Sequence, residues 1–113
     1  MTKSFAVACV LFAAPLASAI PVSGGDGRCD VFAGGAGMVN GTVVDHTGSV
    51  VQGAQVSVRN VTKGVQRFTT GVTGRKGDFN FHAGVNAGDT IDVVVSWVDS
   101  KGTKRSFSGR VTV

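Results

Sequence analysis

Residues 41–54 decide the fold, and they read Gly41-Thr42-Val43-Val44-Asp45-His46-Thr47-Gly48-Ser49-Val50-Val51-Gln52-Gly53-Ala54. The order of apolar and turn-forming residues predicts a strand that ends at Asp45 and a turn that closes on Gly48. Glycine at position 48 lets that turn adopt a positive φ. The pair Gly53-Ala54 is expected to let the chain cross close to a neighbouring sheet, where a larger side chain would collide. A second strand then begins.

The chain after residue 37 alternates apolar and polar residues with the period of a β-strand. Turn-forming residues separate the apolar runs, and no window of ten residues there has its apolar residues at the spacing of one helix face. All seven acids are Asp, which fits an all-β chain because helices favour Glu. The spacing predicts a β-sandwich or a β-barrel of short strands, and the alternation places Phe79 in its core. Strands are expected over residues 38–45, 54–60, 65–72, 78–82, 90–98 and 103–113.

Residues 1–19 have the pattern of a secretory signal peptide. Lys3 is followed by an uncharged, mostly apolar run, and Ala17-Ser18-Ala19 supplies the small residues that a signal peptidase reads. The run is shorter than the roughly 20 residues of a membrane-spanning helix. We therefore expect no membrane span and a mature chain that begins at Ile20. It would be secreted, into the extracellular space or, from a bacterial source, into the periplasm.

Residues 20–37 are rich in glycine and are expected to form a flexible segment ahead of a single domain over residues 38–113. A short edge strand is predicted within it, at residues 30–32. Cleavage removes Cys9, so Cys29 has no partner within the mature chain. Three alternatives stay open for Cys29: a free thiol, an intermolecular disulfide that would join a homodimer, or a reactive thiol.

The mature chain is basic: removal of Lys3 leaves ten of the eleven bases against seven acids, a net charge of +3. The bases are spread along the sequence, and two interpretations stay open. They belong to a solvated β-surface, or they form a patch that binds an anionic polymer or phospholipid. Nucleic acid is not expected, because no aromatic residues interleave with the bases. Gly74 and Gly77 bracket a short turn that presents Arg75 and Lys76 outward. We identify these two residues as a candidate recognition turn.

Residues that could support catalysis are few. Asp45-His46 and His82 come nearest, but adjacent residues on a tight turn point in different directions. The sequence lacks a Gly-x-Ser-x-Gly elbow, an Asp-x-Asp-x-Asp calcium loop and a metal-ligand spacing of Cys and His. We therefore expect no enzyme, no catalytic residue, no cofactor and no metal. Asn40 and Asn60 each begin an Asn-x-Thr sequon, which makes them candidate N-glycosylation sites.

Two motifs follow one another over residues 41–96. The first is Gly41-x-Val43-x-Asp45-x-x-Gly48-x-Val50-x-x-Gly53-Ala54-x-Val56. The second is Thr73-x-x-x-Gly77-x-Phe79-x-Phe81, followed by Gly88-x-x-Ile91-x-Val93-x-Val95. In this order the two motifs resemble the carboxypeptidase regulatory-like domain. Gly74 departs from the family pattern, which usually has Asp or Asn there. The residues that would determine the fold are Gly41, Gly48, Gly53, Ala54, Gly77 and Phe79.

The resemblance implies a Greek-key β-sandwich of six to seven strands that is immunoglobulin-like or transthyretin-like (prealbumin-type) and close in architecture to the B-type repeats of collagen adhesins. It also implies a non-catalytic role. We expect a secreted module that binds a cell-wall or matrix polymer, or a partner protein, through its loops. The alternative is a secreted effector or inhibitor that binds a host protein, for example through an edge strand.

Overall fold

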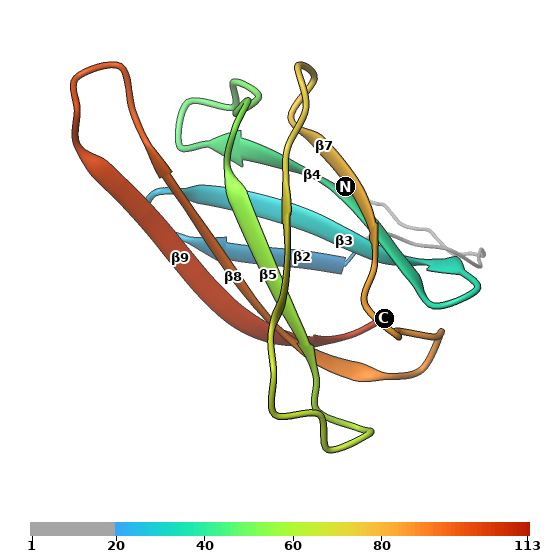
Figure 1. Cartoon of the computed structure of the whole chain (residues 1–113). Coiled ribbons are helices and arrows are strands. Elements are labelled where there is room, and N and C mark those ends of the chain that lie inside the picture. Colours follow the sequence, from blue (N-terminus) through green and yellow to red (C-terminus); the bar gives the residue numbers. More distant parts are fainter. Residues whose placement is uncertain (1–19) are drawn as a thin grey trace, which may run out of the picture.

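The computed structural model describes residues 20–113, so the predicted signal peptide lies outside the described residues. This part of the chain is all-β and forms two antiparallel sheets (Figure 1). The sheet orders are β2-β3-β4-β7 and β6-β5-β8-β9. The strands are β2 (Ile20–Gly24), β3 (Gly27–Gly35), β4 (Met38–Asp45), β5 (Gln55–Asn60), β6 (Thr69–Val72), β7 (Asp78–His82), β8 (Thr90–Val98) and β9 (Lys104–Thr112).

The connections cross between the two sheets in Greek-key order. β4 pairs with β7, although the chain between them passes to the other sheet and forms the β5–β6 hairpin there. The predicted strands over residues 38–45, 78–82 and 90–98 coincide with β4, β7 and β8. The strand expected over residues 65–72 is shorter, because only its last four residues pair with β5. The predicted Greek-key sandwich is confirmed.

The prediction of a flexible segment over residues 20–37 is wrong. These residues form β2 and β3, and β3 is an internal strand that pairs with β2 on one side and β4 on the other. Cys29 and Val31 on β3 are fully buried, so this strand supplies part of the core. The glycines lie in the two hairpin turns and at close contacts: a Cβ on Gly24 would lie 2.7 Å from Cβ of Phe107. The sequence predicts six to seven strands. The described part of the chain has eight, because residues 20–37 form β2 and β3.

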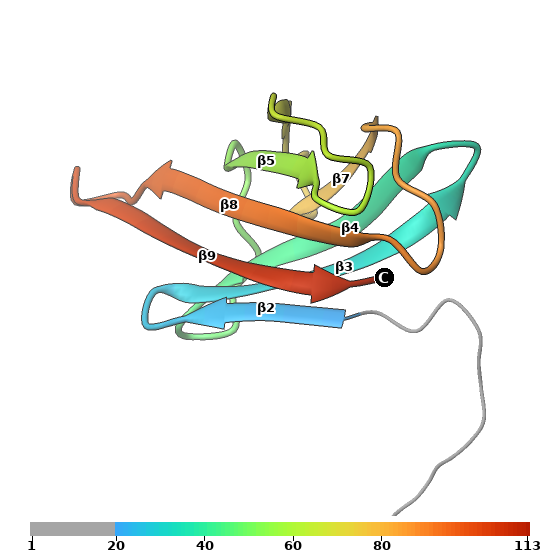
Figure 2. The same cartoon turned by 90° about the horizontal axis from the view of Figure 1, so that it is seen from below.

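The core lies between the sheets and is mainly aliphatic. Phe79 is 5% exposed, which confirms its predicted place in the core. At one margin β2 and β9 run side by side (Figure 2), and Asp26 from the β2–β3 turn accepts a hydrogen bond from the Ser106 N–H at 3.1 Å. The buried apolar residues are Val22, Cys29, Val31, Val39, Val43, Val51, Ala54, Val56, Val58, Phe79, Val85, Ile91, Val93, Val95 and Phe107.

Two glycines of the opening motif have different roles from one another. A Cβ on Gly41 would overlap the carbonyl oxygen of Asp30 and lie 2.6 Å from Cζ of Phe79, so β3 and the aromatic core leave no space there. Gly53 has open space around it, and its φ of +79° is what requires glycine. The predicted steric role of Gly53 is therefore wrong, because the close passage belongs to the fully buried Ala54.

Candidate functional site

Three connections form what we call the upper end of the molecule: residues 45–54, 73–77 and 99–103, toward the top of Figure 1. The β4–β5 connection begins with a turn in which Oδ1 of Asp45 accepts the N–H groups of Thr47 (2.9 Å) and Ser49 (3.0 Å). Gly48 has the predicted positive φ, +88°, and it donates its N–H to the Asp45 carbonyl at 3.0 Å. The Thr47 hydroxyl bond is the main cause that lowers the pKa of Asp45.

The β8–β9 hairpin repeats the same turn. Oδ1 of Asp99 accepts the N–H groups of Lys101 and Thr103, both at 2.9 Å, and Gly102 donates to the Asp99 carbonyl at 3.0 Å. Oδ2 of Asp99 accepts a further bond from Nε of Arg105 at 3.1 Å. The backbone bond from Thr103 is the first cause that lowers the pKa of Asp99. A carboxylate therefore rigidifies each of these two tips.

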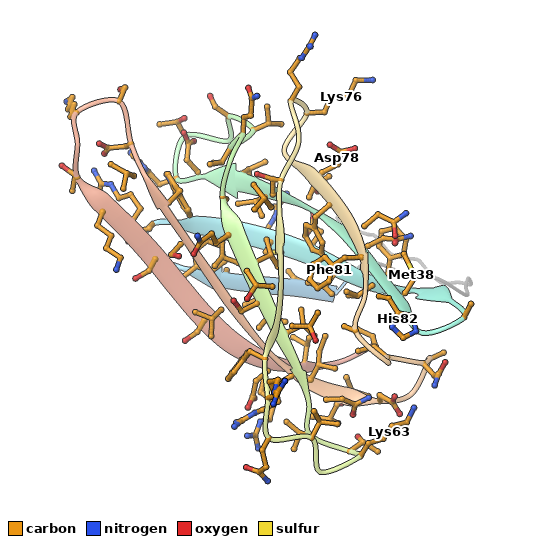
Figure 3. All side chains as sticks on the ribbon, viewed as in Figure 1. Met38, Lys63, Lys76, Asp78, Phe81 and His82 are labelled. Atoms are coloured by element: carbon orange, nitrogen blue, oxygen red, sulfur yellow. The ribbon has the colours of Figure 1, made fainter. Side chains whose placement is uncertain are left out.

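The candidate recognition turn has the same backbone pattern without the carboxylate. Gly77 donates its N–H to the Gly74 carbonyl at 2.9 Å, and Gly74 donates to the Asp78 carbonyl at 2.8 Å. Arg75 and Lys76 between them are exposed, as predicted. Lys76 projects from the upper end, opposite to Lys63 (Figure 3).

A buried threonine attaches this turn to the body of the sandwich. The Thr73 hydroxyl donates to the Val51 carbonyl at 2.6 Å and accepts the Ala54 N–H at 2.9 Å. The Thr73 carbonyl also accepts the Gly53 N–H at 3.0 Å. Thr73 is 3% exposed, so these bonds are shielded from water. The recognition turn is therefore held directly against the crossing at residues 50–54.

Unpaired positive charge gathers at the upper end. Within residues 20–113, five bases enter no ion pair, and only Arg67 of these lies at the other end of the molecule. The other four are Arg75, Lys76, Lys101 and Lys104. Arg75 and Lys76 are predicted from the sequence, whereas Lys101 and Lys104 are not, because only the fold shows that the β6–β7 connection and the β8–β9 hairpin lie at the same end of the molecule.

Asn60 is the less suitable of the two candidate glycosylation sites. It is 1% exposed, and its Nδ2 donates to the Gly84 carbonyl (3.0 Å) and to Oδ2 of Asp89 (2.8 Å). A glycan would replace one of these hydrogens and require space that the loops around residues 84–89 occupy. The fold thus contradicts a modified Asn60, because this amide is a structural bridge between the β5–β6 and β7–β8 connections.

Asn40 lies in the middle of β4, opposite Phe32 and Asn80 on the neighbouring strands. Its side chain is half-buried, and a Cβ on Gly34 would lie 2.6 Å from its Nδ2. The β3–β4 hairpin therefore crowds the amide nitrogen that would carry a glycan. Modification of Asn40 stays a prediction from its sequon.

Cys29 is a free thiol that is fully buried on β3. Burial, with a smaller effect from the charge of Asp30, raises its pKa to about 12. A reactive cysteine needs a thiolate and access to its partner, and Cys29 has neither. Burial also excludes an intermolecular disulfide while the sandwich stays closed, so the structure favours the free thiol over the reactive thiol and the Cys29-linked homodimer.

The outer face of the β6-β5-β8-β9 sheet carries a charged cluster that the sequence does not predict. Asp92 on β8 pairs with Arg59 on β5 (2.5 Å) and with Arg110 on β9 (2.7 Å). The hydrogen bond from Arg110 is the first cause that lowers the pKa of Asp92 to about 2, and the bond from Arg59 is the second. The Arg59 guanidinium also lies 5.0 Å from the ring centroid of Phe68. The three charged residues are far apart in sequence, so only the strand register reveals the cluster.

Acid should destabilise the protein through Asp92 in particular. Its pKa is lower in the folded than in the unfolded chain, so its contribution to stability is complete above about pH 4 and is lost as the pH falls toward 2. We expect the Tm of wild type to fall over this interval. Asp92→Asn should have a lower Tm than wild type at pH 7 and nearly the same Tm at pH 2. Thermal melts followed by circular dichroism test this, and a gap between the two proteins that is equally wide at both pH values would contradict it.

The residues considered for catalysis do not come together. Asp45 and His46 lie at the upper end, whereas His82 pairs with Met38 at the opposite end of β4. Between residues 20 and 113 there is no group of three His, Cys, Asp or Glu side chains that could hold a metal ion. The same part of the chain contains no helix long and apolar enough to cross a membrane.

Comparison with known proteins gives no relative from which a role could be transferred. No family model matches the chain, and neither a curated protein nor a solved structure does. The resemblance to the carboxypeptidase regulatory-like domain thus stays a prediction from the two motifs.

Proposed function

We propose that this chain is a secreted, non-catalytic binding module for an anionic cell-wall or matrix polymer, or for an acidic partner protein. The observation that carries the proposal is the group of four bases at the upper end, Arg75, Lys76, Lys101 and Lys104, which enter no ion pair within the described residues. Such bases remain available to a negatively charged partner, and their combined field would speed its approach.

The frame beneath these bases supports a binding role. Asp99 fixes the hairpin tip that carries Lys101, and Thr73 attaches the turn that carries Arg75 and Lys76. Binding then costs little backbone ordering, because the turns already have their hydrogen bonds. The side chains themselves are exposed to solvent, which suits a polymer whose charges lie at variable spacing.

A second candidate function is that of an effector or inhibitor that adds a strand from a host protein to β6. β6 is an edge strand of four residues, and Val72 on it is 61% exposed. β6 itself carries no charged residue that would discourage pairing with another chain. Binding of this kind would depend on the backbone of β6 and little on salt.

Removal of the two turn bases tests the proposed function. Arg75→Ala with Lys76→Ala should leave stability within about 0.5 kcal/mol of wild type, because both side chains are exposed. Binding to an anionic wall polymer or acidic protein should weaken several-fold, and wild-type binding should fall as salt is added. Thermal melts and binding isotherms at several salt concentrations measure both effects.

The matched control is Arg28→Ala with Arg67→Ala, which removes the same charge elsewhere and should keep most of the affinity. Equal, salt-insensitive binding by wild type and the turn variant would reject the upper end. In that case Val72→Pro, which alters the edge of β6, should be the variant that abolishes binding.

A further inference from the structure

The outer face of the β6-β5-β8-β9 sheet has a row of short side chains along its middle. Ser57 on β5 lies opposite Val94 on β8, and Val94 lies opposite Ser108 on β9. Ser96 and Ser106 form the next outward pair. The strand register places Arg59 and Arg110 at one end of this row and Lys104 at the other. We call these five residues the serine trough.

The structure has two shallow depressions along this trough. One is lined by Phe68, Asp92, Val93, Val94, Ser108 and Gly109. The other, nearer the upper end, is lined by Gly53, Gln55, Ser96, Trp97, Val98 and Lys104. From Asp92 to Val98 the strand advances about 20 Å. The two depressions therefore suit one extended ligand better than two small ones.

Positive charge predominates at both ends of the trough. At one end, Arg59 and Arg110 share the single carboxylate of Asp92, which leaves a net charge of +1. The Arg110 side chain is 59% exposed, so part of its guanidinium faces solvent. At the other end Lys104 is exposed and enters no ion pair among residues 20–113. A ligand along the trough would thus meet a cation at each end.

We propose that the serine trough binds an extended polysaccharide that carries carboxylates, a polyuronate. Its carboxylates would pair with Arg110 at one end and Lys104 at the other, while its hydroxyls bond to the serines between them. The exposed parts of Phe68 and Val94, each 37% exposed, would contact the apolar faces of the sugar rings. This inference rests on the proposed function: it names the polymer class and adds a binding face that shares Lys104 with the upper end.

A sugar polymer fits this face better than a peptide or a lipid surface. β5 and β8, which carry Ser57, Val94 and Ser96, are hydrogen-bonded to neighbours on both sides, so a peptide strand would find no free backbone groups there. β9 is an edge strand, but β2 lies beside it and Asp26 accepts the Ser106 N–H. The exposed apolar side chains stand singly among serines and charges, so they offer no continuous area for lipid. Hydroxyls and separated cations are the groups that a uronate chain can use.

Binding of the purified protein to polygalacturonate, to its methyl ester and to poly-glutamate tests the proposal. Wild type should bind the acid polymer, with weaker binding to the ester, which lacks the charge, and to poly-glutamate, which lacks the rings. Arg110→Gln with Lys104→Gln should weaken polygalacturonate binding about tenfold, since both end contacts are lost. The control pair Arg28→Gln with Arg67→Gln should weaken it much less.

Two further variants remove a negative charge from the trough or place one in it. Asp92→Asn should strengthen binding several-fold, because the carboxylate that competes for both arginines is removed. Val94→Glu places a negative charge in the trough and should abolish binding, whereas Thr42→Glu, an exposed position on the central strand of the other sheet, should not. Melts confirm that each variant is folded.

The results separate this inference from the proposed function. If the Arg75/Lys76 variant loses polygalacturonate binding while the Val94→Glu variant keeps it, the trough is rejected and the upper end stands on Arg75, Lys76 and Lys101. If wild type binds the methyl ester or poly-glutamate as tightly as it binds polygalacturonate, the uronate assignment is rejected. Binding to no polymer and no acidic protein would reject the proposed function itself.

Discussion

Replacing Phe79 with alanine is expected to unfold the domain or leave it barely folded. The ring is 5% exposed, packs 5.8 Å from the ring of Phe81 and lies against Gly41 across the β4–β7 pair. Truncation of such a phenylalanine typically costs ~3–5 kcal/mol, from lost apolar burial and from the cavity that remains. A domain of this size has a total stability of ~5–15 kcal/mol, so the loss is a large fraction of it.

Urea or thermal unfolding of the purified variant measures this effect. Phe68→Ala is the matched control, since it removes the same ring from a position that is 37% exposed and should cost much less. A Phe79→Ala protein that melts like wild type would show that this ring does not support the core. The side chains of β7 that face the core and those that face solvent would then have been assigned the wrong way round.

Gly41→Ala is expected to be nearly as damaging, for the opposite reason. The added Cβ would overlap the carbonyl oxygen of Asp30 and press on Cζ of Phe79, so the β3–β4 pair or the ring must move. Overpacking of a core usually costs ~1–3 kcal/mol, and here the obstacle is backbone, which yields less than a side chain. We expect the upper part of that range or more.

Gly25→Ala is the control for this substitution. Gly25 has open space around it and no positive φ, so the added methyl group should change stability by less than about 0.5 kcal/mol. Equilibrium unfolding of both variants under the same conditions gives the comparison. Equal stability of Gly41→Ala and Gly25→Ala would contradict the close contact between β3 and β4.

The sequence predicts the second half of the sandwich well because local signals agree there. Alternation places Val56, Val58 and Phe79 inward, and glycine with Asp or Asn marks the turns. The first hairpins are missed because their glycines resemble those of a flexible segment. In the fold these glycines serve tight turns and close contacts with β4 and β9, which depend on partners distant in sequence.

The candidate site is predictable only in part, for a similar reason. The exposure of Arg75 and Lys76 follows from their place in a turn, and Gly74 and Gly77 predict that turn. The bridge from Asn60 to Asp89 and the pairing of Asp92 with Arg110 require the register of strands that lie far apart in the chain. Sequence spacing alone gives no access to that register.

An anionic partner is proposed to bind at the basic upper end. Titration of the isotopically labelled protein with an anionic polysaccharide, followed by the amide chemical shifts, tests this binding. The largest shifts are expected at Arg75, Lys76, Lys101 and Lys104, and added salt should reverse them. Shifts confined to the loop at residues 61–68 or to the edge of β6, with no change at the upper end, would contradict it.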